Sequence, residues 1–154
     1  QCDGPNNQQW RIIGVLNALT AQVDYLDGYI VGRKKVIDMY EHLNKVYSWA
    51  ERIYVAQDNW SIHKHDDVLN ALVSLPRIEP VWLPTYSPWL NPIEKLWRWL
   101  RCDVLKMHRL AGEWKELRIR VNRFLGQFAN GCRELLYYVG LLGDGKLARV
   151  IQDA

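Results

Sequence analysis

The sequence IEPVWLPTYSPWLNPIEKLWRWLR, residues 78–101, decides how the chain is interpreted. It opens with an apolar run at 78–83, which predicts a short strand. Prolines at positions 84 and 88 follow closely, and because each proline fixes one φ angle, the connecting loop is expected to be stiff. A helix that mixes apolar and basic residues then begins near position 92.

The start of this helix carries a glutamate where helix capping alone would favour one. Asn91 suits the N-cap, Pro92 the first helical position and Glu94 the third. Apolar residues at three- and four-residue spacing predict the buried side of the helix: Ile93, Leu96, Trp97, Leu100 and Val104. Taken by itself, Glu94 is explained by capping.

A second carboxylate follows an earlier apolar run. Residues 53–56 (IYVA) are uninterrupted by polar side chains, which predicts a central strand covered on both faces. Asp58 and Asn59 come just past its carboxyl end, where open α/β sheets place their functional sites. The plain alternatives are a turn role for Asp58 and a packed or surface position for His63.

The remaining patterns predict a layered α/β domain. Two apolar runs at 10–19 and 22–31 predict a hairpin, and amphipathic spacing predicts a helix at 34–49. Asp66 is the expected N-cap of the next helix, and a further helix is expected at 113–128. The order is hairpin, helix, strand, helix, strand, helix, and this alternation is typical of α/β folds.

Composition indicates an ordinary globular chain with one strongly basic segment. Of 154 residues, 49% are hydrophobic, and no apolar run is long enough to span a membrane. No secretory signal is recognisable and the three cysteines are widely spaced, so a reducing cytoplasm is expected. The net charge is +3, but residues 95–133 hold ten basic and three acidic side chains, an excess of +7. This excess favours a polyanionic partner such as nucleic acid, with a solvated helix face as the alternative.

Asp58 and Glu94 are the candidate metal ligands. They lie 36 positions apart, one at a strand end and the other in the first turn of the helix after the next strand. Such positions can converge at one edge of a sheet, and carboxylate oxygens are what Mg²⁺ or Mn²⁺ binds. Two ions about 3.5–4 Å apart activate a water or a DNA 3′-hydroxyl and stabilise the leaving oxygen in phosphodiester chemistry.

Two motifs resemble the catalytic domain of mariner-type transposases, most closely their bacterial insertion-sequence relatives. The first is YVAQDNWSIHK at 54–64, an apolar strand ending in Asp-Asn with a histidine shortly after. The second is WLPTYSPWLNPIEKLWRWLR at 82–101, with Leu-Pro, Tyr-Ser-Pro and Leu-Asn-Pro-Ile-Glu before a Trp-bearing helix. The resemblance covers residues 10–128 in the order of elements. Trp89 stands where many eukaryotic members carry an acidic residue, which favours the bacterial branch.

The resemblance implies a ribonuclease H-like fold, a mixed sheet flanked by helices, and a DDE endonuclease that cleaves and transfers DNA strands in transposition, recombination and integration. It implies that Asp58 and Glu94 are the second and third members of the catalytic triad and bind Mg²⁺ or Mn²⁺, as two ions. Asn59 and His63 are then supporting residues that orient a ligand or touch DNA.

The partners implied are double-stranded DNA, from transposon ends and target, and a second copy of the full-length protein in a homodimer. No membrane partner is expected, and the implied location is cytoplasmic and nucleoid-associated. Exposed basic residues after Glu94 are expected to contact the DNA backbone: Lys95, Arg98 and Arg101.

The family's first aspartate is not found at its expected place on a strand before the hairpin. Asp3 lies in a turn sequence, and Asp24 and Asp27 lie on the hairpin's return strand, so none is expected to replace it. We therefore expect residues 1–130 to be an amino-terminally incomplete catalytic domain lacking its first strand, with 131–154 as a helical tail. A truncated, split or frameshifted reading frame and an inactive chain are the corresponding expectations. The alternatives are a non-catalytic remnant that binds DNA or a transposase subunit, and a related nuclease that does not transpose.

Overall fold

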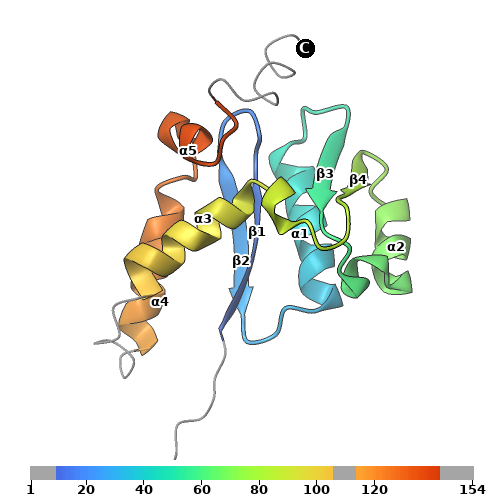
Figure 1. Ribbon diagram of the computed structural model, residues 1–154. Helices are drawn as coiled ribbons and strands as arrows, with labels where there is room; N and C mark the ends of the chain where they lie inside the picture. The colour runs from blue at the N-terminus through green and yellow to red at the C-terminus, as the bar shows by residue number, and fades with distance from the viewer. Residues whose placement is uncertain (1–9, 106–113, 143–154) are drawn as a thin grey trace, which may run out of the picture. The chain divides into compact units, whose positions relative to one another are not determined.

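The computed structural model describes residues 10–105 and 114–142 and has the predicted mixture of strands and helices (Figure 1). None of the helices in these two ranges is both long and apolar enough to cross a membrane. The elements in chain order are β1 (Arg11–Leu16), β2 (Val23–Gly28), α1 (Arg33–Val46), β3 (Ile53–Gln57), the 3₁₀ turn η1 (Ser61–Lys64), α2 (Asp66–Val73), β4 (Ile78–Trp82), the 3₁₀ turn η2 (Pro88–Leu90), α3 (Ile93–Leu100), the π-helical turn η3 (Arg101–Leu105), α4 (Trp114–Gly126) and α5 (Arg133–Tyr138).

The described residues fall into two compact units. The first holds residues 10–13 and 25–91, and the second holds 14–24 with 92–105 and 114–142. The predicted hairpin forms as the β1–β2 pair, and β3 pairs with β4 in a separate two-stranded sheet. The predicted boundary at residue 130, between a catalytic domain and a tail, stays a prediction.

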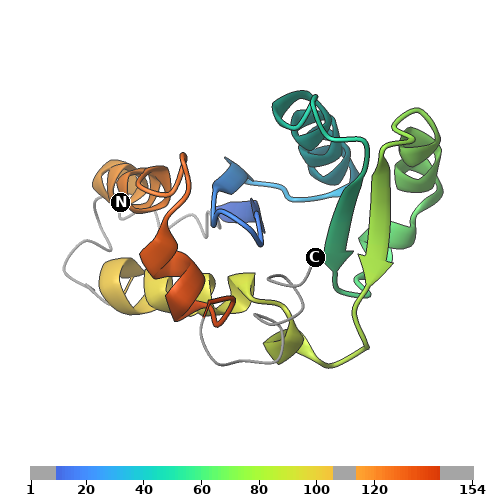
Figure 2. The same cartoon turned by 90° about the horizontal axis from the view of Figure 1, so that it is seen from above.

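The first unit is built on the parallel pair β3–β4. Ile53 lies opposite Ile78, and this register continues to Gln57 opposite Trp82. Figure 2 shows the two strands side by side with their arrowheads pointing the same way. Because the strands are parallel, their carboxyl ends lie at the same edge of the sheet.

Burial along β3 alternates, so the prediction that this strand is covered on both faces is wrong. Val55 and Gln57 are buried, whereas Tyr54 and Ala56, which point to the other face, are exposed, Tyr54 at 64%. A two-stranded sheet with helices packed on one face leaves its other face open, and an apolar run of four residues does not reveal this. The same alternation places Val81 on the exposed side of β4.

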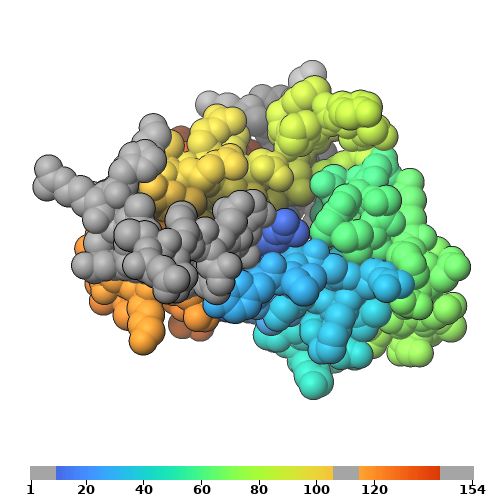
Figure 3. All heavy atoms as spheres, turned by 90° about the horizontal axis from the view of Figure 1, so that it is seen from below, coloured from blue at the N-terminus to red at the C-terminus, as the bar shows by residue number. Residues whose placement is uncertain are grey.

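Helix α1 covers the buried face of the pair. Its apolar stripe is buried as predicted, and the Tyr40 hydroxyl donates a hydrogen bond of 2.6 Å to Oε1 of Gln57 on β3. The Gln57 Nε2 group is buried without a hydrogen-bond partner in the described part of the chain. Figure 3 shows the light-blue residues of α1 directly against the green residues of η1 and α2.

Helix α2 begins one residue earlier than predicted. His65, not Asp66, is its N-cap, because the His65 Nδ1 atom accepts the backbone N–H of Asp67 at 3.2 Å. Arg33 at the start of α1 pairs with Asp67 at 2.8 Å, which connects the amino-terminal ends of the two helices. Val68 is fully buried beneath this contact region.

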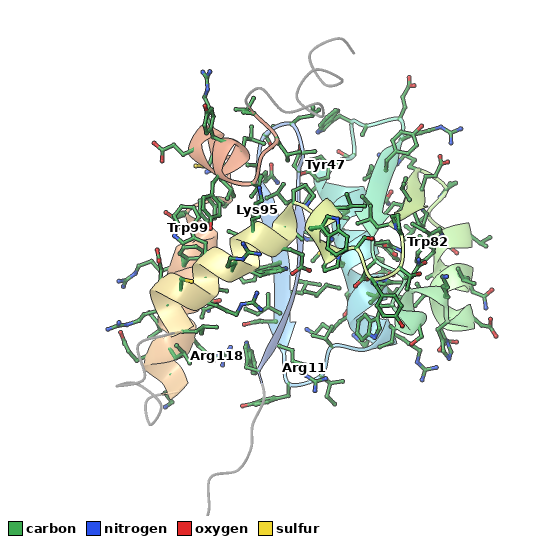
Figure 4. The ribbon with its side chains drawn as sticks, viewed as in Figure 1. Arg11, Tyr47, Trp82, Lys95, Trp99 and Arg118 are labelled. Atoms are coloured by element: carbon green, nitrogen blue, oxygen red, sulfur yellow. The ribbon has the colours of Figure 1, made fainter. Side chains whose placement is uncertain are left out.

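The second unit is organised by α3. The predicted stripe is buried at Ile93, Leu96, Leu100 and Val104. The Trp97 ring lies against Gly14 of β1, where an added Cβ would come within 2.7 Å of the ring. On another side of α3, the Trp99 ring, labelled in Figure 4, packs on three aromatic side chains from α4, from the turn just after α4 and from α5: Phe124, Phe128 and Tyr138.

The turn of the β1–β2 hairpin is joined to the segment between α4 and α5. The Val23 N–H donates to the Phe128 carbonyl at 3.0 Å, and the Cys132 N–H donates to the Thr20 carbonyl at 2.9 Å. Gly131 has φ +87°, and a Cβ there would lie 2.7 Å from the Thr20 oxygen. Only glycine allows this close approach without a shift of the backbone.

One arginine closes the carboxyl-terminal end of α1. The Arg77 guanidinium, just before β4, donates to the backbone carbonyls of Asn44, Tyr47, Ser48 and Ala50 at 2.6–3.2 Å. It also donates to the Asn44 side chain at 2.7 Å. A cation at this end satisfies carbonyls that lack helical partners and complements the helix dipole.

We predict that Arg77→Ala lowers the free energy of unfolding by about 2–3 kcal/mol, because several partly buried carbonyls lose a charged donor. Arg77→Lys should recover little of this loss, since an ammonium cannot reproduce the planar fork. Urea denaturation measures the effect. Arg52→Ala is the control: Arg52 forms a surface pair with the half-exposed Glu79, and its loss should cost less than about 1 kcal/mol. Equal losses for Arg77→Ala and Arg52→Ala would contradict this account.

Candidate functional site

Asp58 lies immediately beyond β3, at the carboxyl edge of the parallel pair, as predicted. Its side chain is 70% exposed. The contact it makes with the described residues is to His63, whose Nε2 atom is 3.4 Å from Oδ1 of Asp58. Most of the carboxylate is therefore open to a ligand.

His63 lies beside the Asp58 carboxylate and is itself largely buried. Its side chain is only 12% exposed, and its ring lies 5.6 Å from Trp60 and 6.3 Å from Trp82, measured between ring centroids. Burial lowers the pKa of His63, and the nearby Asp58 carboxylate offsets this shift in part. The His63 Nδ1 atom is buried and has no hydrogen-bond partner among the described residues.

Asn59 connects the end of β3 to the loop after β4. Its Nδ2 group donates to the Leu83 carbonyl at 2.9 Å and to the Thr85 hydroxyl at 3.1 Å. The Leu83 N–H in turn donates to the Gln57 carbonyl at 2.9 Å. Asn59 thus holds the proline-containing loop against the strand end that carries Asp58, and its predicted role in orienting a ligand or touching DNA stays a prediction.

Glu94 is the second residue of α3 rather than the third. The predicted N-cap at Asn91 is wrong by one residue: the helix starts at Ile93, and Pro92 precedes it with helical φ and ψ. Asn91 instead ends η2, since its N–H donates to the Pro88 carbonyl at 3.0 Å. Glu94 is half-buried, and its carboxylate forms no hydrogen bond or ion pair with any residue in the described ranges. A side-chain capping bond therefore does not explain why a glutamate stands at this position.

A wide pocket beside Asp58 was not expected from the sequence. Its volume is about 560 Å³, and its lining residues all belong to the first unit: Arg11, Ile12, Val31, Asp58 and Trp60. The pocket thus lies between the first residues of β1 and the carboxyl end of β3. No local pattern marks Arg11 or Trp60, because they meet across a long stretch of sequence.

Two of the aspartates considered as substitutes for the family's first carboxylate, Asp24 and Asp27, lie on β2 of the hairpin. Asp27 accepts the Trp10 indole N–H at 2.9 Å, and Asp24 accepts the Gln22 side-chain amide at 3.2 Å. Asp3 lies outside the described residues. The basic residues Lys95, Arg98 and Arg101 are exposed on and just after α3, as predicted, and Lys95 is labelled in Figure 4.

The described residues offer a divalent metal ion single carboxylates rather than a cluster of ligands. Within residues 10–105 and 114–142, no three or more histidine, cysteine, aspartate or glutamate side chains gather into a possible metal site. Asp58 offers hard oxygen donors that the fold leaves open, which suits Mg²⁺ or Mn²⁺. A complete site needs additional oxygens beside it.

A family model described as the DDE superfamily endonuclease matches residues 3–118, which include Asp58 and Glu94. The chain belongs to this family. An uncharacterised 39 kDa protein of insertion element IS630 from Shigella sonnei is 28% identical over 119 residues. The match covers 77% of this chain but only 34% of that protein, so the chain spans about a third of its relative's length. No solved structure gives a significant match. The predicted family is thereby confirmed.

We predict that Asn59→Ala destabilises both the loop that follows β4 and the folded chain as a whole. Loss of two hydrogen bonds should lower the free energy of unfolding by about 1–2 kcal/mol. Hydrogen exchange should accelerate at the Leu90 and Asn91 amides, which bond within η2, more than at amides inside α1. Thr85→Val, which removes one of the two bonds, is the graded control. Uniform acceleration across the first unit would contradict a local role for Asn59.

Proposed function

We propose that this chain supplies two metal-binding carboxylates, Asp58 and Glu94, to a transposase that cleaves and transfers DNA strands. The observation that carries the proposal is the family match across both residues, combined with their state in the structure. Asp58 follows β3 directly at the carboxyl edge of a parallel pair, and neither carboxylate is used in a salt bridge to a lysine or arginine of the described residues.

We further propose that the complete catalytic domain is ribonuclease H-like and needs one more strand beside β3. In the described part of the chain, β3 pairs only with β4, and β1 only with β2. An unpaired strand edge leaves backbone N–H and C=O groups without partners. The pocket lined by Arg11, Ile12 and Asp58 supports this proposal, and an aspartate at the end of such a strand would complete the carboxylate set.

When bound, Mg²⁺ or Mn²⁺ ions would activate the attacking oxygen and stabilise the leaving one. The residues of this chain position the carboxylates and bind the DNA. His63 lies beside Asp58, with Nε2 3.4 Å from Oδ1, and as a neutral ring it leaves the negative charge of Asp58 available. Asn59 sets the distance between the β3 end and the loop. Lys95, Arg98 and Arg101 hold the DNA through its phosphates.

A second candidate function is a non-catalytic module that binds DNA or a transposase subunit. The observations that favour it are the two separate sheets and the lack of a group of three ligands among the described residues. The two functions make different predictions for the same variants.

Cleavage of DNA bearing the insertion-element ends tests the proposal. The chain alone is expected to be inactive with Mg²⁺, and the chain preceded by the corresponding strand of the Shigella sonnei relative should nick the DNA. In this extended protein, Asp58→Asn and Glu94→Gln should each reduce the rate more than about a hundredfold. Asp66→Asn is the matched control and should retain activity, since Asp66 is exposed at the start of α2.

Activity of the unextended chain would overturn the requirement for a further strand. If the extended protein binds DNA but never cuts it, and Asp58→Asn binds equally well, the non-catalytic module is the better account.

Salt dependence tests the DNA contact separately. Each phosphate contact contributes about 0.9 to the slope of log K against log salt concentration. Replacing Arg98 and Arg101 together by glutamine should therefore lower the slope by up to about 2. Lys34→Gln is the control, because Lys34 is exposed on α1 and pairs with Asp38. An unchanged slope in the double variant would exclude these arginines as phosphate contacts.

A further inference from the structure

The loop that joins β4 to α3 presents aromatic rings to solvent. In this aromatic loop, residues 83–91, Tyr86 is 90% exposed and Trp89 is 73% exposed. Neither ring makes a hydrogen bond or ring contact with any residue of the described ranges. Burial of large aromatic side chains is a major stabilising contribution to folding, and these two rings do not provide it.

The aromatic loop is nevertheless held in a defined shape. Pro84 and Pro88 each fix a φ angle, and Asn59 binds the loop through Leu83 and Thr85. The Leu90 N–H donates to the Ser87 carbonyl at 3.0 Å and closes η2. The rings are therefore displayed by a stiff backbone, which reduces the entropy lost when they bind a partner.

Tyr86 occupies a backbone conformation that is unfavourable for its residue type. Its φ is +59°, in the left-handed region that glycine and asparagine adopt most readily. Folding alone would favour one of those residues here, because the tyrosine ring contributes no contact in return. A strained residue that keeps an exposed ring indicates a binding role.

The surroundings of the aromatic loop favour a nucleic-acid partner. The loop has no charged residue of its own, and it leads into α3, whose exposed side chains are basic. On the strand that precedes it, the Trp82 ring has the Lys64 Nζ atom 5.2 Å from its centroid; Trp82 is labelled in Figure 4. Aromatic faces combined with cations are the usual means of binding unpaired strands, because every base offers a stacking face.

We infer that Tyr86 and Trp89 stack on unpaired bases of the DNA strand next to the cleavage point. This inference rests on the proposed function, since it concerns how the same substrate is held. Asn59 contacts the aromatic loop directly and follows Asp58 in sequence, so a base held by the loop would lie close to the candidate metal ligand. The protein would then bind partly opened DNA more tightly than a fully paired duplex.

Fluorescence anisotropy with the full 154-residue chain tests the inference. The probes are two labelled duplexes of equal length, one fully paired and one with a few mismatched bases at its centre. The wild-type chain should prefer the mismatched duplex about tenfold. Trp89→Ala and Tyr86→Gly should each lose most of this preference and keep their affinity for the paired duplex, whereas Trp89→Phe should keep part of it.

Tyr86→Gly separates binding from folding. Because glycine suits the left-handed conformation, this variant should unfold at the same or a higher urea concentration while losing the preference. Trp49→Ala is the matched control: Trp49 is also largely exposed, at 77%, but precedes β3 at the opposite end of the strand from Asp58. It should retain the full preference.

Equal binding of the two probes by the wild-type chain, or an unchanged preference in Trp89→Ala and Tyr86→Gly, overturns the inference and leaves the proposed cleavage function intact. Failure to bind either duplex overturns both. If Tyr86→Gly instead alters the oligomeric state in sedimentation and not the preference, the aromatic loop is a contact surface for a second copy, and the inference is wrong.

Discussion

The side chain of Asn59 links the carboxyl ends of two parallel strands, and the candidate site depends on that link. Parallel pairing brings the ends of β3 and β4 to one edge, but it does not by itself hold the loop that follows β4. Two hydrogen bonds from one amide to Leu83 and Thr85 do this. Asp58, the preceding residue, is thereby placed beside a fixed loop rather than a mobile one.

His63 completes this arrangement from the other direction. Trp60 and Trp82 lie beside its ring, and burial lowers the pKa of His63, which favours a neutral ring that does not cancel the charge of Asp58. Other carboxylates in the described part of the chain are used by the fold: Asp27 accepts Trp10, and Asp103 accepts Trp99 at 2.5 Å. Asp58 and Glu94 differ from these two, because neither carboxylate forms a hydrogen bond with a residue in the described part of the chain.

The sequence predicted those features that depend on local periodicity. The hairpin, α1, α4 and the buried stripe of α3 follow from apolar spacing, and Asp58 was placed at a strand end because an apolar run stops there. The exact residue that caps each helix was less predictable from the sequence. His65 rather than Asp66 caps α2, and Pro92 rather than Asn91 precedes α3, since a neighbouring residue can take either position at small cost.

Features that depend on contacts between distant segments gave no sequence signal. Arg77 closes a helix that ends some thirty residues earlier in the chain, and Arg11 meets Asp58 in one pocket. The open face of β3 was also missed, because IYVA has the same composition in a two-sided or a one-sided strand. The family resemblance, by contrast, was carried by motif residues whose spacing is visible directly, and the family match confirmed it.

We propose that Asp58 and Glu94 bind the same metal centre. A double-mutant cycle on Mn²⁺ affinity, measured by electron paramagnetic resonance with the extended protein, tests this most directly. The account predicts that Asp58→Asn and Glu94→Gln each weaken Mn²⁺ binding and that the double variant is little worse than either single one. Independent effects that multiply in the double variant, or no effect of Glu94→Gln, would contradict a shared centre.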